Sequence, residues 1–247
     1  MFVPQKLIVH YHHCSVNNVG DIFIDYLNVL LFFLKNFFNC TFIQFVEEIH
    51  PYSNGVYPYA FNTLEGKVLY DIEIVDYMKN IYLFDLIDYE LYIGLISELN
   101  IILLYYLWVD DNIYNNFTKK IYKDRFFYLY YIYLIRKLKK ENLQKCQMRG
   151  LDNHKFNIQR LKTIINILDN IVSGSYNSTN KNDICFFHCI CFSILSIFYS
   201  IPSKFNKELQ NVLISKPKLI DFVKDVNSKY SIWKNEKVFL SGVSEVC

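Results

Sequence analysis

The segment Ile184–Ile201, "ICFFHCICFSILSIFYSI", restricts the possible folds more than any other part of the chain. It carries no formal charge over its whole length, although it includes His188 and several small polar residues. A helix that is apolar on every side has to be surrounded by other protein or by lipid. Its length is marginal for crossing a bilayer. We therefore predict a buried core helix, with a membrane span as the alternative.

Polar residues on either side of this segment predict where the helix begins and ends. The sequence "NKND" precedes it, so that Asn180 is a good N-cap. Asp183 follows three residues later, where a capping box usually has Glu or Gln. Pro202 comes directly after the segment and stops the helix. We expect Asn180 and Asp183 to have structural roles and no part in chemistry.

Strand patterns are confined to residues 1–80. Segments rich in β-branched and aromatic residues predict four strands, at 6–12, 40–46, 58–62 and 67–70. A dense apolar stretch between the first two predicts a helix capped by Asp21, and Asp71 begins a second helix that runs to Lys79. The expected order is therefore βαβ followed by ββα.

The rest of the chain has helical patterns only. They predict helices at 89–109, 117–145, 156–172, 183–201 and 217–230. In the third of these helices, apolar residues recur at spacings of three and four, namely Leu161, Ile164, Ile165, Leu168, Ile171 and Val172. We predict an α+β domain over residues 1–80 and an all-α domain over residues 84–247.

Several segments, in their order and spacing, carry a resemblance to a known family. They are "SNGVYPYAF", "ELNIILLYYLWVDD", "RKLKKENLQKCQMRGL", "NDICFFHCICF" and "NKELQNVLISKPKLIDFVKDVNSKY". The chain resembles the glutathione-transferase superfamily and, within it, the metaxins. The resemblance implies a thioredoxin-like N-terminal domain followed by a helical bundle. It also implies that "SNGVYPYAF" carries the cis-proline of this fold, at Tyr57–Pro58.

The metaxins are cytosol-facing subunits of the sorting and assembly machinery of the mitochondrial outer membrane. The resemblance therefore implies a non-enzymatic protein without a cofactor, which assists the membrane insertion of β-barrel proteins. Its expected partners are the β-barrel core subunit, a second metaxin-like subunit and the sorting strands of precursors. The tail "SIWKNEKVFLSGVSEVC" is too short and polar to span a bilayer, so we expect the peripheral type. A net charge of +2, spread along the chain, gives no reason to expect nucleic acid.

The ligand groove of this superfamily has altered residues in this chain. Tyr57–Pro58 either holds an extended thiol ligand or only fixes the entry of a strand, and we favour the second. Transferases bind a ligand carboxylate at the N-terminus of the helix after the last strand. Here that position holds Tyr70, Asp71 and Glu73. The two carboxylates favour the helix dipole and repel an anionic ligand, so we predict that the tripeptide site is lost.

Two alternative functions follow from other features. A glutathione-dependent thiol transferase or peroxidase would use Cys14, which lies beside His12 and His13 and, by the sequence pattern, just before a helix. Tyr11 and Ser15 are other candidate nucleophiles in that segment. A glutathione-transferase-fold scaffold in a cytosolic assembly is the other alternative.

Three further features have default interpretations. Cys185, His188, Cys189 and Cys191 form a partial metal set, but no fourth ligand is evident, and we predict no metal. The seven cysteines include no C-x-x-C pair, which favours free thiols in a reducing compartment. The basic segment 136–145 is expected to be a solvated helix face, with binding to anionic lipid as the alternative.

Overall fold

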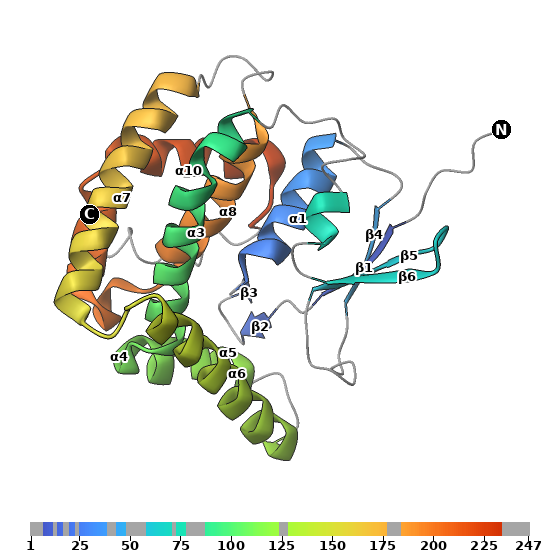
Figure 1. Cartoon of the computed structure of the whole chain (residues 1–247), viewed down its shortest axis with the longest axis horizontal. Coiled ribbons are helices and arrows are strands. Elements are labelled where there is room, and N and C mark those ends of the chain that lie inside the picture. Colours follow the sequence, from blue (N-terminus) through green and yellow to red (C-terminus); the bar gives the residue numbers. More distant parts are fainter. Residues whose placement is uncertain are drawn as a thin grey trace.

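A small mixed sheet near the N-terminus and a larger set of helices make up the computed structural model of the chain (Figure 1). The structure describes residues 7–11, 14–16, 20–22, 25–38, 43–47, 58–70, 73–77, 87–123, 128–176 and 184–233. These two parts are compatible with the predicted order of an α+β domain and a helical bundle. The expected boundary, between residues 80 and 84, lies outside the described residues.

The sheet has the strand order β4-β1-β5-β6. Its strands are β1 (Leu7–Tyr11), β4 (Ile43–Glu47), β5 (Tyr59–Asn62) and β6 (Lys67–Tyr70). β1 pairs in parallel with β4, while β5 is antiparallel to both β1 and β6. In the turn between β5 and β6, Gly66 has a φ of 63°, a left-handed conformation that glycine adopts at little cost. All four predicted strands are confirmed.

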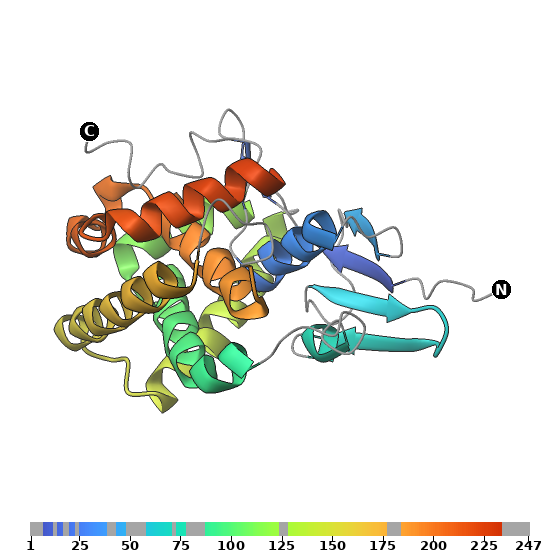
Figure 2. The same ribbon diagram turned by 90° about the horizontal axis from the view of Figure 1, so that it is seen from above.

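Helix α1 (Tyr26–Phe38) connects the parallel pair and lies between the sheet and the other helices (Figure 2). The prediction that Asp21 caps this helix is wrong. Asp21 belongs to β3 (Gly20–Ile22), which pairs with β2 (Cys14–Val16) in a separate two-stranded sheet. The carboxylate of Asp25 accepts a hydrogen bond of 2.8 Å from the backbone N–H of Leu27, so the helix begins four residues later along the chain than Asp21 suggested.

Residues beyond the sheet are helical in every described segment that has regular structure. The helices are α3 (Ile87–Trp108), α4 (Asp111–Ile113), the π-helix η1 (Tyr114–Thr118), α5 (Lys119–Lys123), α6 (Tyr128–Met148), α7 (His154–Ser175), α8 (Phe186–Ser200), the 3-10 helix η3 (Ser203–Phe205), α9 (Lys207–Ile214) and α10 (Pro217–Tyr230). The helix predicted at 156–172 is longer in the structure, because α7 continues through Gly174 to Ser175. Residues 73–77 form a further helical segment after β6, as predicted.

Helix α8 is the centre of the helical part, as its sequence predicted. Every residue from Phe186 to Ser200 is buried. Helices α1, α3, α9 and α10 all contact α8, and the rings of Phe33 on α1 and Phe192 on α8 lie 5.2 Å apart between centroids. Among the described helices, the stretch Leu91–Trp108 of α3 is long and apolar enough to cross a membrane by length and composition. Core helices of soluble proteins pass the same test, and 44% of that stretch is buried here.

The predicted cap of α8 needs correction. Asn180 and Asp183 lie outside the described residues, and the N-cap position is occupied by Cys185. Cys185 and His188 form a capping box, in which the imidazole Nδ1 accepts the backbone N–H of Cys185 at 3.3 Å. The spacing of the box is the one expected from the sequence, but it begins five residues further along the chain.

Candidate functional site

The predicted ligand groove begins where the chain enters β5. Tyr57 lies outside the described residues, while Pro58 is buried directly before the strand. The next residue, Tyr59, faces His10 of β1. Their rings are stacked, with centroids 4.4 Å apart and planes at 4°. This stack holds the first residue of β5 against β1 and fits the interpretation in which Pro58 fixes the entry of the strand.

A carboxylate of the chain lies at the start of the helical segment 73–77. The Glu73 side chain accepts a hydrogen bond of 3.2 Å from the backbone N–H of Tyr70, and Lys67 Nζ lies 3.8 Å from its other oxygen. The Glu73 side chain is 48% exposed, so the ion pair contributes only a fraction of a kcal/mol, roughly 0–1. Asp71 lies outside the described residues. A ligand carboxylate approaching this helix start meets a negative charge that is already bound there.

Cys14 is on a strand and does not precede a helix directly. It pairs with Ile22 in the hairpin of β2 and β3, and α1 begins only at Tyr26. The expectation that Cys14 lies just before a helix is therefore wrong. Of its expected partners, His12 and His13 lie outside the described residues.

Cys185 and His188 contact each other, but Cys189 and Cys191 do not join them in a metal site. The Cys185 Sγ lies 3.2 Å from Nδ1 of His188. Both other thiols are fully buried, and burial raises their pKa well above the ordinary value of a thiol. Among the described residues, no group of three His, Cys, Asp or Glu side chains has the geometry to hold a metal ion.

Ser175 completes a chain of hydrogen bonds that the sequence did not suggest. Its Oγ lies 2.9 Å from Nε2 of His188, although it comes from the last turn of α7. The histidine therefore has a thiol on one ring nitrogen and a hydroxyl on the other. The sequence contained a signal for half of this arrangement, a Cys and a His at capping-box spacing before an apolar helix. The serine is brought in by tertiary packing.

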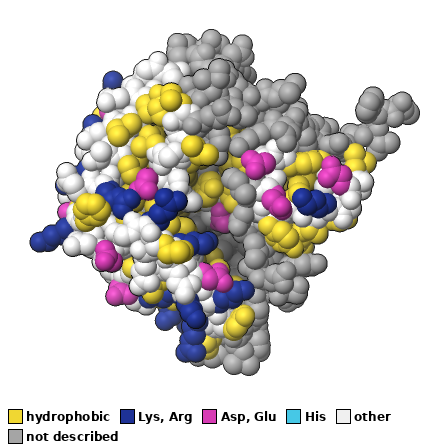
Figure 3. Space-filling view, in the orientation of Figure 1, with side chains coloured by type: hydrophobic (Ala, Val, Ile, Leu, Met, Phe, Trp, Pro, Cys, Tyr) yellow, Lys and Arg dark blue, Asp and Glu magenta, His cyan; other side chains and the backbone are white. Residues whose placement is uncertain are grey.

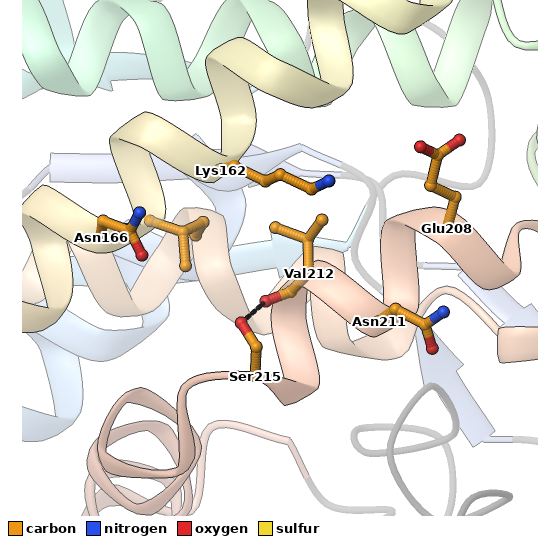
Figure 4. Close-up of a pocket in the computed structure, with 7 residues that line it drawn as sticks. Lys162, Asn166, Glu208, Asn211, Val212 and Ser215 are labelled. Atoms are coloured by element: carbon orange, nitrogen blue, oxygen red, sulfur yellow. Dashed lines mark hydrogen bonds between the residues drawn. The ribbon is translucent and has the colours of Figure 1, made fainter.

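An open pocket of about 330 Å³ lies between α7 and α9 (Figure 4). Lys162 extends across it from α7 toward α9, and Ser215 donates a hydrogen bond of 2.7 Å to the carbonyl of Val212. Lys162, Glu208 and Asn211 are all exposed. Water competes for each of these polar groups, which weakens the electrostatic interactions between them.

A groove of about 480 Å³ between α3 and α7 is lined mainly by apolar atoms. One turn beyond its lining, by helix periodicity, Leu91 of α3 is 68% exposed and Ile167 of α7 is 42% exposed. Glu98 at the other end forms an ion pair with Arg160. Figure 3 shows hydrophobic side chains on this face and Lys and Arg side chains gathered at its lower end, over α6.

Comparisons of the chain with protein-family models, with curated proteins and with solved structures gave no match.

Proposed function

We propose that the chain is a non-enzymatic, metaxin-like subunit of the sorting and assembly machinery of the mitochondrial outer membrane. It acts peripherally on the cytosolic face, in contact with the β-barrel core subunit and a second metaxin-like subunit. There it binds the sorting strands of β-barrel precursors during their insertion. The sequence resemblance is the origin of this proposal, and three features of the structure support it.

The sheet supports the glutathione-transferase-like part of the proposal. Its parallel pair, β1 and β4, is connected through α1, and an antiparallel hairpin of β5 and β6 follows. A helical segment at 73–77 comes next. This is the βαβ–ββα order that the resemblance implies, with Pro58 directly before β5.

The contact between Glu73 and the Tyr70 backbone carries the non-enzymatic part of the proposal. In a transferase, a ligand carboxylate has to bind at the start of the helix that follows the last strand. Here the chain's own Glu73 carboxylate lies at that start and accepts the Tyr70 N–H at 3.2 Å. Two carboxylates about 4 Å apart repel each other by about 1 kcal/mol in water and by at most about 4 kcal/mol near a protein surface, and the half-exposed Glu73 lies toward the lower value. A glutathione-like ligand is therefore disfavoured at this position, and a binding role is left.

The outer strands of the sheet offer a physical route to precursor binding. β4 and β6 lie at the two edges of the four-stranded sheet. An extended peptide can add to such an edge through main-chain hydrogen bonds. Gln44 on β4 is exposed, so a probe placed there reports on an added strand.

Affinity isolation of the tagged full chain from detergent-solubilised mitochondria tests the proposal. We expect an outer-membrane β-barrel protein and a second metaxin-like protein to co-purify in comparable amounts. A complex without any barrel protein, or a diffuse cytosolic signal of the tagged chain, would instead favour a cytosolic scaffold.

Two further measurements distinguish precursor binding at the sheet edge from catalysis at Cys14. A photo-crosslinker at Gln44 should capture a β-barrel precursor, while one at the exposed Lys224 on α10 should not. Retention on immobilised glutathione, together with transferase activity that Cys14→Ser abolishes, would overturn the non-enzymatic proposal in favour of a thiol transferase.

A further inference from the structure

We propose that Cys185 is a reactive thiol, at which small-molecule disulfides form a mixed disulfide with the protein. His188 is the proton acceptor for this thiol, and Ser175 is a positioning residue that orients the imidazole. The inference does not depend on the proposed function, since it concerns a site at the start of α8 and not the sheet.

The hydrogen bonds around His188 define its tautomer. The hydroxyl of Ser175 donates its single proton to the carbonyl of Ile171, at 2.8 Å. At the 2.9 Å contact with Nε2, the serine oxygen must therefore accept, so Nε2 carries the proton. Nδ1 of the neutral ring is then an acceptor, in agreement with the backbone N–H of Cys185 that points to it.

The thiol of Cys185 therefore lies beside a basic nitrogen. Its Sγ is 3.2 Å from Nδ1, which is within range for transfer of the thiol proton. A nucleophile, a base and a third group that orients the base are the parts by which activated thiols are recognised. Here they are Cys185, His188 and Ser175, drawn from the two ends of the connection between α7 and α8.

The position of Cys185 also stabilises the thiolate. It is the N-cap residue of α8, a helix of fifteen residues. The N-terminus of a helix attracts negative charge and so favours the anionic form of a thiol placed there. Proton transfer to His188 leaves the imidazolium next to the thiolate, and each charge stabilises the other. Cys185 as a residue is partly exposed, unlike the buried His188.

The three other cysteines whose side chains the structure describes lack these features. Cys146, Cys189 and Cys191 are fully buried. Burial raises the pKa of Cys146 to about 11 and that of the other two well above the ordinary value. Thiols of this kind are inert, and modification should therefore select Cys185 over these three cysteines.

Among the described residues around His188, the titratable groups keep their charge state near neutral pH. Tyr176 follows Ser175, and its ring lies 5.8 Å from the imidazole of His188. Its hydroxyl bonds to Asp225 on α10, which pairs with Lys229 at 3.1 Å. Burial raises the pKa values of Tyr176, Tyr230 and Cys189, so these groups remain neutral in the assay range of about pH 5–9.

The modification is a balanced thiol–disulfide exchange. The S–H bond of Cys185 breaks, and its proton passes to Nδ1 of His188. The thiolate attacks one sulfur of the small disulfide, so that a new S–S bond forms as the old one breaks. The leaving thiolate then takes the proton from His188. Cys185 is oxidised to the mixed disulfide, and the other half of the reagent is reduced to a free thiol.

The test uses the purified full chain and 4,4′-dithiodipyridine, whose released thiopyridone is followed by absorbance. Peptide mapping by mass spectrometry assigns each adduct to a cysteine. We expect Cys185 to be modified before Cys146, Cys189 and Cys191. At pH 6.5 an ordinary thiol, with a pKa of about 8.5, is only about 1% thiolate. At this pH, Cys185 in the native chain should be modified at least about tenfold faster than the same cysteine in the urea-unfolded chain.

Matched variants separate reactivity from capping. In His188→Asn, the side-chain oxygen can still accept the Cys185 N–H but cannot take a proton. We expect His188→Asn to fold and to lose the faster modification of Cys185 at pH 6.5. In Ser175→Ala the rate of modification should fall less, and its dependence on pH should shift. The comparison of native and unfolded wild-type chain needs no variant. Slower modification of Cys185 in the native chain, or an unchanged pH profile in His188→Asn, would overturn the proposal.

Discussion

Removal of the Asp110 carboxylate should destabilise two helices that are far apart in the sequence. Asp110 is the N-cap of α4, and its Oδ1 accepts the backbone N–H of Ile113 at 3.0 Å. Its Oδ2 accepts a hydrogen bond of 3.0 Å from the side-chain amide of Asn206. Asn206 in turn caps α9, where its Oδ1 accepts the backbone N–H of Leu209 at 2.9 Å. The two caps therefore support each other.

The expected loss follows from these three hydrogen bonds. Replacing a capping residue with alanine costs about 1 kcal/mol. The bond between a carboxylate and an amide adds roughly 1.5 kcal/mol, the low end for charged groups because both side chains are only partly buried. Asp110→Ala and Asn206→Ala should therefore each lower the free energy of unfolding by about 2–3 kcal/mol. Because the bond between them is lost only once, the double variant should lose about 1.5 kcal/mol less than the sum.

Urea denaturation of the wild-type chain, both single variants and the double variant measures this coupling directly. Asp111→Ala is the matched control, because the Asp111 side chain is 87% exposed and its ion pair with Lys139, at 3.6 Å, is solvated. That variant should change the free energy of unfolding by less than about 0.5 kcal/mol. Strictly additive losses for Asp110 and Asn206 would refute the reasoning, since they would mean that the caps act independently.

Three further predictions concern the core and the end of α10. Phe192→Ala on α8 should lower the free energy of unfolding, measured by urea denaturation, by about 3–5 kcal/mol. Phe156→Ala, at a residue that is 56% exposed, should lower it by less than about 1 kcal/mol. Equal losses would contradict the central position of α8. Cys146 has a pKa raised to about 11, so the native chain holds a proton that the unfolded chain loses. Stability should consequently fall between about pH 9 and 11, by up to about 1.4 kcal/mol per pH unit, and Cys146→Ala should remove that part of the slope. The side chain of Asn227 bonds the N–H of Trp233 at 2.7 Å and its carbonyl at 3.2 Å. Asn227→Ala should therefore release the buried indole and shift its fluorescence to longer wavelength; an unchanged spectrum would show that packing alone holds Trp233.

The parts of the fold that the sequence predicted are those with a long or repeated apolar pattern. The uncharged segment around α8 can only be buried when it lies within a protein. The four strands of the sheet are each rich in β-branched and aromatic residues. Short-range features were missed where they have no period. β2 and β3 have three residues each, too few to show alternation, and so their residues could not be told from the start of α1. Gly174 is inside α7, because the glycine cost of about 1 kcal/mol is smaller than the stabilisation from packing.

In the candidate sites, too, contacts between residues close in the sequence could be predicted, and contacts between distant residues could not. The place of Glu73 at the start of a helix could be predicted, because a capping contact joins residues close in the sequence. The contact of Ser175 with His188 could not, since it depends on how the end of α7 packs against the start of α8. The π-helix η1 was not predicted either. Its buried Thr118 donates a hydrogen bond of 2.7 Å to the carbonyl of Leu107, eleven residues earlier in the chain. Such contacts have no local sequence signal.

The capping box of α8 explains why a thiol and an imidazole lie at this end of the helix. The first N–H groups of any helix need acceptors, and here the acceptor His188 is almost fully buried. A carboxylate cap would attract the helix dipole strongly, but burial of its charge would be costly. The Cys185–His188 pair caps the helix in a neutral form. One proton transfer converts it to thiolate and imidazolium without a change in net charge, but the protonated Nδ1 can then no longer accept the Cys185 N–H. Capping and reactivity therefore compete for the same ring nitrogen, and the variant His188→Asn separates them, because it keeps an acceptor for the N–H and removes the base.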